Sequence, residues 1–434
     1  MTRKLFSLIL MSFLVVVTAN LTLLADDIVP GSEQRITTHN DAEILSGEPD
    51  YYAIEGDTVV WIDQRNGYTN QYVYGVDLTD INLDEFLIDD EGGYISKIAL
   101  ANSMAFYPIT PSTPITPSTP EQDYYFLRLA DISNPASINY YDIDPNGADG
   151  YFQDLDMSGS LIAFSTYNDT TGECRLIAAD ISDPTTIVQH IIFSTSSYGI
   201  YDLTLDGNYL CWINYYSENP IQVADITDLA NPVIQTLPLD GDDVYMNGLD
   251  SSGDWLVAQG QLGWDSPGGL FAIKKYWDVE NFTIELVWET QDDATEALYP
   301  QIDQDKLIWI FHDYGYGGGG YAGEGDVEFY SLYQANFLPT GPGPASELLK
   351  TTESDPEFLR GATLSGDTIV LAYGDDLLYS AELEMGCGDW GYLPADLNED
   401  CMVNLLDFAK FAESWLYCTD PTKPGCIFGV FNHN

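Results

Sequence analysis

The sequence predicts an all-β fold, in which a β-propeller of about seven blades is followed by a small C-terminal loop–helix module. A unit of a short strand, a tight turn and an apolar strand recurs at a spacing of roughly 50 residues, the length of a four-stranded blade. The formal net charge is -55, yet 45% hydrophobic and 13% aromatic residues provide for a folded core. We therefore predict a signal peptide at 1–25, the propeller at 26–385 and the C-terminal module at 386–434.

Hairpin turns mark the repeated unit, because a tight turn between two strands favours residues that accept a positive φ. The turns of the clearest copies contain Gly56, Gly159, Gly207 and Gly366. Those of the weaker copies centre on Asn102, Gly253 and Gln304. The strand after the turn carries an equivalent tryptophan in three copies, and we expect these side chains in the core. They are Trp61, Trp212 and Trp309.

The repeat also predicts how the ring closes. Each blade has a face that only its neighbours bury, so a closed ring is the stable arrangement. The last unit lacks an outer strand, and residues 35–38, before the first unit, have the character to supply it. Deleting residues 34–39 is therefore expected to lower the melting temperature sharply.

The ends of the third strands share a pattern in which an aspartate precedes Ile-Ser or Ile-Thr. Examples are Asp131, Asp180 and Asp225. With the spacing of the turns, this pattern resembles the blades of TolB-type propellers, and the endings are similar to LVIVD-type repeats of secreted bacterial proteins. The resemblance covers residues 50–383 and implies the propeller fold.

Insertions interrupt the repeat between the second and third strands of their units. Residues 108–120 are rich in proline and predict an extended polyproline-like stretch, residues 314–325 are rich in glycine, and residues 264–269 occupy the same connection in another unit. These connections should emerge on one face of the ring, which in repeat folds is often the binding face. Their aromatic residues either stack on sugar rings of a polysaccharide or are solvent-facing loop residues without a ligand. They are Trp264, Tyr314, Tyr316 and Tyr321.

The N-terminus predicts secretion to the extracellular space or the cell surface. Arg3 and Lys4 precede an apolar run at 5–24 that ends in small residues near Ala25, as in a cleaved signal peptide. No later run is long and apolar enough to predict a membrane span. The 69 acidic against 14 basic side chains repel phosphate backbones and anionic membrane faces, which argues against nucleic acid as a partner.

The C-terminal module contains a candidate calcium loop that leads into an amphipathic helix. Carboxylates and amides recur at alternate loop positions, and a hard cation prefers six to eight such oxygens. The predicted ligands are the side chains of Asp396, Asn398, Asp400, Asn404 and Asp407 and the backbone carbonyl of Met402. The alternative is an Asp/Asn-rich turn that merely begins a helix.

This loop and helix, residues 396–416, resemble one half of a type I dockerin, an EF-hand-like module of secreted polysaccharide-processing systems. The resemblance implies Ca²⁺ as the cofactor and docking to a cohesin-like protein or a cell-surface component. The sequence contains one copy of the unit where dockerins carry two, and Cys401 stands where the loop usually has glycine.

The four cysteines around this loop predict disulfide bonds, because so small a module in an oxidising compartment needs cross-links. They are Cys387, Cys401, Cys418 and Cys426. Three connectivities are possible; we favour Cys387 with Cys401 and Cys418 with Cys426. Cys174 and Cys211 lie in apolar strand patterns, where a buried thiol and a bridge are both open.

Catalytic signals are sparse. The four histidines lack metal-ligand spacing, and no nucleophile elbow, phosphate loop or dinucleotide fingerprint is present. His312 with Asp313 is the one pair that merits a test, and 142–147 is a second possible calcium loop or an interblade turn.

We expect a binding and attachment protein. The alternatives are a glycoside hydrolase or polysaccharide lyase of extracellular polysaccharide breakdown, and a structural surface protein whose tail packs on the propeller.

Overall fold

The computed structural model describes residues 28–383 except 30–31, 38–48, 66–69, 112–125, 145–150, 169, 197–198, 216, 218, 240–243, 263–267, 291–294, 314–328, 339–340, 344, 353–358 and 374–376. The predicted signal peptide and C-terminal module lie outside this part of the chain. Within it, strands dominate, and η1 (Pro49–Tyr51) is the one helical element. In these ranges no helix has the length and apolar character needed to cross a membrane.

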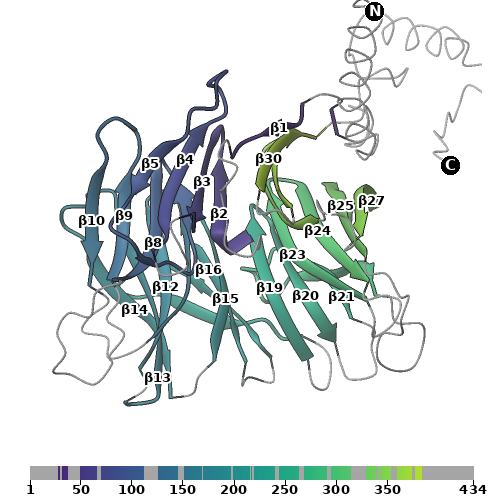
Figure 1. The fold of residues 1–434 in the computed structure, drawn as a ribbon. Coiled ribbons are helices and arrows are strands. Elements are labelled where there is room, and N and C mark those ends of the chain that lie inside the picture. Colours follow the sequence, from purple (N-terminus) through teal and green to yellow (C-terminus); the bar gives the residue numbers. More distant parts are fainter. Residues whose placement is uncertain are drawn as a thin grey trace, which may run out of the picture.

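The described strands form seven antiparallel sheets, arranged as the blades of a propeller (Figure 1), and this confirms the predicted fold. From the innermost strand outward, blade 1 contains β2 (Tyr52–Glu55), β3 (Thr58–Asp63), β4 (Tyr72–Asp77) and β5 (Phe86–Asp89). Blade 2 contains β7 (Ala99–Ala101), β8 (Met104–Pro111), β9 (Phe126–Asp131) and β10 (Asn139–Ile143), with β6 (Gly93–Tyr94) paired to β8. Blade 3 contains β11 (Tyr151–Ser158), β12 (Leu161–Asn168), β13 (Glu173–Asp180) and β14 (Val188–Thr195).

The remaining blades follow the same order. Blade 4 contains β15 (Ile200–Asp206), β16 (Tyr209–Asn214), β17 (Ile221–Asp225) and β18 (Val233–Thr236). Blade 5 contains β19 (Val244–Ser252), β20 (Trp255–Leu262), β21 (Gly269–Lys274) and β22 (Thr283–Glu289). Blade 6 contains β23 (Thr295–Asp303), β24 (Lys306–Asp313), β25 (Phe329–Leu338) and β27 (Ser346–Thr352), with β26 (Gly341–Pro342) paired to β25. Blade 7 contains β28 (Leu359–Ser365), β29 (Thr368–Tyr373), β30 (Leu377–Glu382) and, outermost, β1 (Gln34–Arg35).

The predicted turn residues all lie in hairpins between the first and second strands of their blades, and all have positive φ. The φ values are 55° at Gly56, 50° at Asn102, 56° at Gly159, 54° at Gly207, 57° at Gly253, 57° at Gln304 and 59° at Gly366. Glycine adopts this region without steric cost, and the two non-glycine turns use an amide residue instead. The seven predicted repeats are therefore confirmed.

The N-terminal strand closes the ring, as predicted. Arg35 pairs with Tyr379 in an antiparallel ladder, and the N–H of Ile36 donates to the carbonyl of Leu378 at 2.8 Å. The pairing begins earlier than the sequence suggested, because Ile28 forms a bridge with Leu383. In Figure 1, β1 lies beside β30, although the two strands come from opposite ends of the ring sequence.

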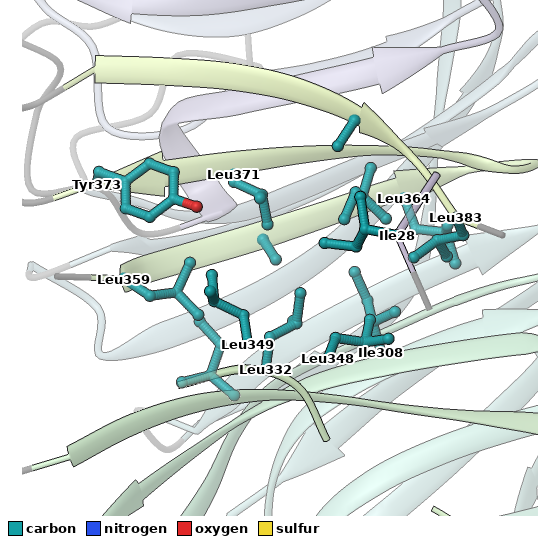
Figure 2. Packing of buried hydrophobic residues seen from close by; sticks show 14 residues of the cluster. Ile28, Ile308, Leu332, Leu348, Leu349, Leu359, Leu364, Leu371, Tyr373 and Leu383 are labelled. Atoms are coloured by element: carbon teal, nitrogen blue, oxygen red, sulfur yellow. The ribbon is translucent and has the colours of Figure 1, made fainter. Parts of the chain in front are cut away.

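The apolar core lies between neighbouring blades. The side chains of Trp61, Trp212 and Trp309 are fully buried, which confirms their predicted place. Figure 2 shows the cluster between blades 6 and 7, where Ile28 lies close to Leu364 and Leu383. The first residues of the ring are therefore part of its core.

Two further sequence predictions are resolved. The proline-rich insertion was predicted to begin at Pro108, but β8 continues to Pro111, and Pro108 pairs with Leu127. Proline is tolerated at residue 108 because β7 pairs with β8 at residues 104–106 only. Beyond that point β7 offers no acceptor for the N–H that proline lacks. Cys174 and Cys211 are buried and free, so the bridge alternative does not hold for them.

Candidate functional site

The two faces of the ring differ in what they carry. The hairpins between first and second strands lie at one face, and the connections between second and third strands lie at the other, together with the starts of the innermost strands. We call the second the insert face, because the predicted insertions join β8 to β9, β20 to β21 and β24 to β25. Their placement is as predicted. The four candidate aromatic residues in them, Trp264, Tyr314, Tyr316 and Tyr321, lie outside the described residues.

The innermost strands surround a central cavity of about 320 Å³. Its lining is rich in carboxyl groups, and Lys97 is the one cation among the described residues that line it. The lining carboxylates are Asp50, Glu55, Asp156, Asp206, Asp250 and Asp303.

Many of these side chains join neighbouring blades. At six of the seven joints, the last residue of an innermost strand accepts a hydrogen bond from the backbone N–H of the next hairpin turn. The pairs are Glu55 with Asn102 (2.8 Å), Ser158 with Gly207 (3.0 Å), Asp206 with Gly253 (2.6 Å), Ser252 with Gln304 (2.8 Å), Asp303 with Gly366 (2.6 Å) and Ser365 with Gly56 (2.9 Å). Blade 2 ends its innermost strand in Ala101, which has no side-chain acceptor. Sequence reasoning missed this ring, although the acidic or serine residue directly before the turn is visible in the repeat.

A second layer of such contacts lies deeper along the same strands. Asp154 accepts from the N–H of Leu203, and Asp156 from that of Leu205, both at 2.7 Å. Asp250 accepts from the N–H of Ile302, also at 2.7 Å. The cavity carboxylates are therefore engaged in holding blades together.

Burial shifts the titration of these groups upward. Burial raises the pKa of Asp156 to about 6, with backbone N–H donors opposing the shift. The pKa of Asp250 is raised to about 8, mainly by burial, while the N–H of Ile302 opposes the shift and the charge of Asp156 adds to it. Burial likewise raises the pKa of Asp202 to about 6.

Lys97 lies at the insert-face end of the cavity. Its Nζ is 2.6 Å from Asp154 and 2.9 Å from Asp50. Burial alone lowers the pKa of Lys97, but the two carboxylates outweigh this effect and raise it well above its usual value. Lys97 is therefore a permanent cation that neutralises part of the buried acidic charge.

Three tyrosines gather on the insert face beside this end of the cavity. Tyr201 is the second residue of β15, Tyr215 follows β16, and Tyr245 is the second residue of β19. The ring centroids of Tyr201 and Tyr215 are 6.4 Å apart, and those of Tyr215 and Tyr245 are 6.3 Å apart. Tyr215 and Tyr245 are 55% and 48% exposed. These aromatics were not singled out from the sequence, because the proximity of Tyr215 and Tyr245 depends on the packing of blades 4 and 5.

The candidate catalytic pair is also at the insert face, at the end of β24. The side chain of His312 is 6% exposed and stacks on Tyr330, with 4.2 Å between ring centroids. This histidine is therefore packed within blade 6.

Metal-ligating groups of three or more His, Cys, Asp or Glu side chains are absent from the described ranges. Of the possible second calcium loop at 142–147, the structure describes 142–144, where Asp142 pairs with Nε of Arg128 at 2.7 Å within blade 2. The candidate calcium ligands 396–407 and the cysteines of the C-terminal module lie outside the described residues.

Comparisons with known proteins support the fold. No family model matches the chain, and no curated protein matches it. This chain is similar to the β-propeller domain of the trilobed protease from Pyrococcus furiosus, which is described as having an open velcro topology. The TM-score is 0.50 at 9% identity, and the match covers 80% of this chain and 97% of that domain. A catalytically inactive virginiamycin B lyase from Staphylococcus aureus has a TM-score of 0.45 and 13% identity, covering 81% and 98%. A putative TolB from Agrobacterium tumefaciens has a TM-score of 0.41 and 12% identity, covering 70% and 94%. At 9% identity, the likeness to the protease domain supports a propeller fold and shows no activity.

Proposed function

We propose that this chain is a secreted calcium-binding protein, in which the propeller is a binding scaffold and the dockerin-like tail attaches it to a partner. The ligand we expect at the insert face is a polysaccharide. The observation that carries the binding role is that the insertions between second and third strands, the exposed tyrosines and one end of the central cavity share one face of the ring.

Two cavity carboxyl groups, Asp156 and Asp250, have raised pKa values, but their hydrogen bonds to neighbouring blades favour a structural role over catalysis. A glycoside-cleaving pair needs one carboxyl group that is free to donate a proton and one that reaches the substrate. Here Asp156, Asp206 and Asp303 accept interblade hydrogen bonds. These groups serve the closure of the ring.

The position of the first paired residue is compatible with cleavage near Ala25, as the proposed secretion requires. Ile28 is 1% exposed and is bridged to Leu383, so cleavage after residue 25 leaves the closing segment within the mature chain. Cleavage several residues later would remove part of the core.

The test of binding uses the mature protein with a panel of soluble and insoluble polysaccharides in calcium buffer. We expect retention of the protein on at least one polysaccharide without release of reducing sugar ends. Release that is lost in His312→Ala would instead identify a carbohydrate-active enzyme. Absence of both retention and release would refute the binding role and favour a structural surface protein.

The test of the tail measures bound calcium by calorimetric titration. We expect Asp396→Ala combined with Asp407→Ala to abolish binding, since each removes a predicted carboxylate ligand. Glu399→Gln, which changes a charged loop residue outside the predicted ligand set, is the matched control and should bind as the wild type does. Equal binding by all three proteins would refute the predicted calcium site.

A further inference from the structure

The outermost strand of each blade has one edge that no other described strand covers. Natural proteins protect such edges by keeping the strand short or by placing charged side chains on it, because an open edge pairs readily with another chain. Most outermost strands of this protein follow that rule. β1 has two residues and β5 and β18 have four each, while β10, β22 and β27 contain Asp, Glu or Lys.

The outermost strand of blade 3, β14, departs from this rule. It has eight residues, more than any other described outermost strand, and none of them is Asp, Glu, Lys or Arg. The run without these residues extends from Pro184 to Tyr201, although 69 of the 434 residues of the chain are acidic. The longest edge of the ring is therefore also one that no charge protects.

Two aliphatic side chains of β14 are exposed to solvent. Val188 is 62% exposed and Ile191 is 52% exposed. Residues three apart in a regular strand point to opposite sides of the sheet, so each side of the edge carries one of them. Ile192 forms a bulge against β13 and is buried, which makes 188–191 the regular part of the edge. This part offers apolar surface on both sides of an uncovered strand.

A second copy of β14 fits this edge better than the other outermost strands of comparable length do. The edge of a sheet is completed by another strand, whose N–H and C=O groups match its own. Pairing with β10, β22 or β27 of another molecule would bring Asp or Glu onto an apolar surface at a cost in desolvation. Pairing with a second β14 adds no carboxylate to the contact, which matters in a chain with a formal net charge of -55.

We propose that the protein forms a two-fold symmetric dimer, in which β14 pairs antiparallel with β14 of a second copy. The dimer goes beyond the proposed binding function and does not depend on it. β14 runs toward the insert face, so antiparallel pairing makes the insert faces of the two rings point in opposite directions, where both stay open to a ligand. One strand pair buries less area than a standard interface, so the dimer is weak and reversible.

The test is sedimentation equilibrium of the full mature chain from about 1 μM to about 1 mM, the range of dissociation constants of a small interface. We expect a monomer–dimer equilibrium in the wild type. Val188→Glu and Ile191→Glu should each weaken dimerisation at least about tenfold, because each places a carboxylate from both copies in an apolar contact. The matched control is Leu286→Glu, which adds the same charge at a 48% exposed position on β22 and should leave the equilibrium unchanged.

Hydrogen exchange locates the contact without any substitution. The backbone amides of residues 188–191 should exchange more slowly at a concentration where the dimer predominates than where the monomer does, whereas the exchange of β22 should not change. Salt gives a further readout. Raising the NaCl concentration should tighten dimerisation at least about threefold, because salt screens the repulsion between two acidic rings.

Several results would overturn the dimer. They are a wild-type protein that stays monomeric throughout the concentration range, equal weakening by Leu286→Glu, exchange at 188–191 that does not depend on concentration, or dissociation at high salt. Ile191→Glu should retain the polysaccharide binding of the wild type, so failure of the dimer and failure of the binding role are separate results. An unchanged midpoint of thermal unfolding in each variant establishes that the fold is intact.

Discussion

Truncating Ile36 tests whether the N-terminal segment holds the ring closed. This side chain is fully buried in the cluster between blades 7 and 1, together with Trp61 and Leu378. Ile36→Ala removes buried methyl and methylene groups and leaves a cavity, while the backbone hydrogen bond to Leu378 remains possible. The expected cost is about 2 to 5 kcal/mol of the free energy of unfolding.

The expected change in melting temperature follows from the size of the ring. Unfolding entropy is about 2.1 cal/mol/K per residue, so a ring of roughly 350 residues has an entropy change near 0.7 kcal/mol/K. A loss of about 3 kcal/mol therefore lowers the melting temperature by about 4 °C. Deleting residues 34–39 removes β1 and Ile36 and leaves residues 378–380 of β30 without their partners, so a larger decrease is expected.

The assay is urea unfolding followed by tryptophan fluorescence, with thermal unfolding by circular dichroism. The matched control is Ile81→Ala, because Ile81 is 97% exposed and its truncation should change the free energy of unfolding by less than about 0.5 kcal/mol. If Ile36→Ala is as stable as Ile81→Ala, the closing segment contributes no stability and the argument fails. An unchanged melting temperature after the deletion would have the same meaning.

Two further predictions concern the carboxylates of the cavity. Asp206→Ala removes the acceptor of the Gly253 N–H, which water can replace in this exposed turn, and should cost about 0.5 to 1.5 kcal/mol, whereas Asp254→Ala in the same turn should cost little; equal urea midpoints would contradict the role of Asp206. The raised pKa of Asp250, about 8 against an ordinary 3.8, means that the folded state binds the proton more tightly, so stability decreases as the pH rises from about 4 through about 8. Asp250→Asn removes this titration, and the difference between urea midpoints at pH 5 and pH 9 should become smaller than in the wild type; an equal difference in both proteins would refute the assignment.

The sequence predicted the fold because the repeat leaves local signals. A glycine at a positive-φ turn, followed by an apolar strand with an inward tryptophan, is recognisable at Gly56 and Trp61 without any knowledge of the partner strands. Closure was also predictable in part, because the last unit lacks an outer strand. The contribution of Ile28 was missed, since a single apolar residue beside a predicted cleavage site carries no periodicity.

The candidate site was less predictable, because it is assembled from residues that no local pattern connects. Tyr201 lies in β15 and Tyr215 follows its partner strand β16, so strand pairing within blade 4 brings these two together. Only the packing of blades 4 and 5 brings Tyr245, in β19, near Tyr215. The end of β8 was misplaced for another reason. Pro108 was expected to end the strand, because proline has no N–H to donate. However, β7 pairs with β8 only as far as Phe106, so β7 offers no acceptor at residue 108, and β8 continues in its pairing with β9.

The bridge between Ile28 and Leu383 also sets the order of events in folding. The part of the ring that is synthesised first pairs with the part that is synthesised last. The N-terminal segment can therefore pair with β30 only after blade 7 has been synthesised. Closing a chain of roughly 350 residues costs about 2 kcal/mol more in loop entropy than closing one blade of roughly 50. Until that moment β30 presents an unpaired edge, which other chains can join. A short, early segment therefore decides whether the newly made protein ends as a ring or as an aggregate.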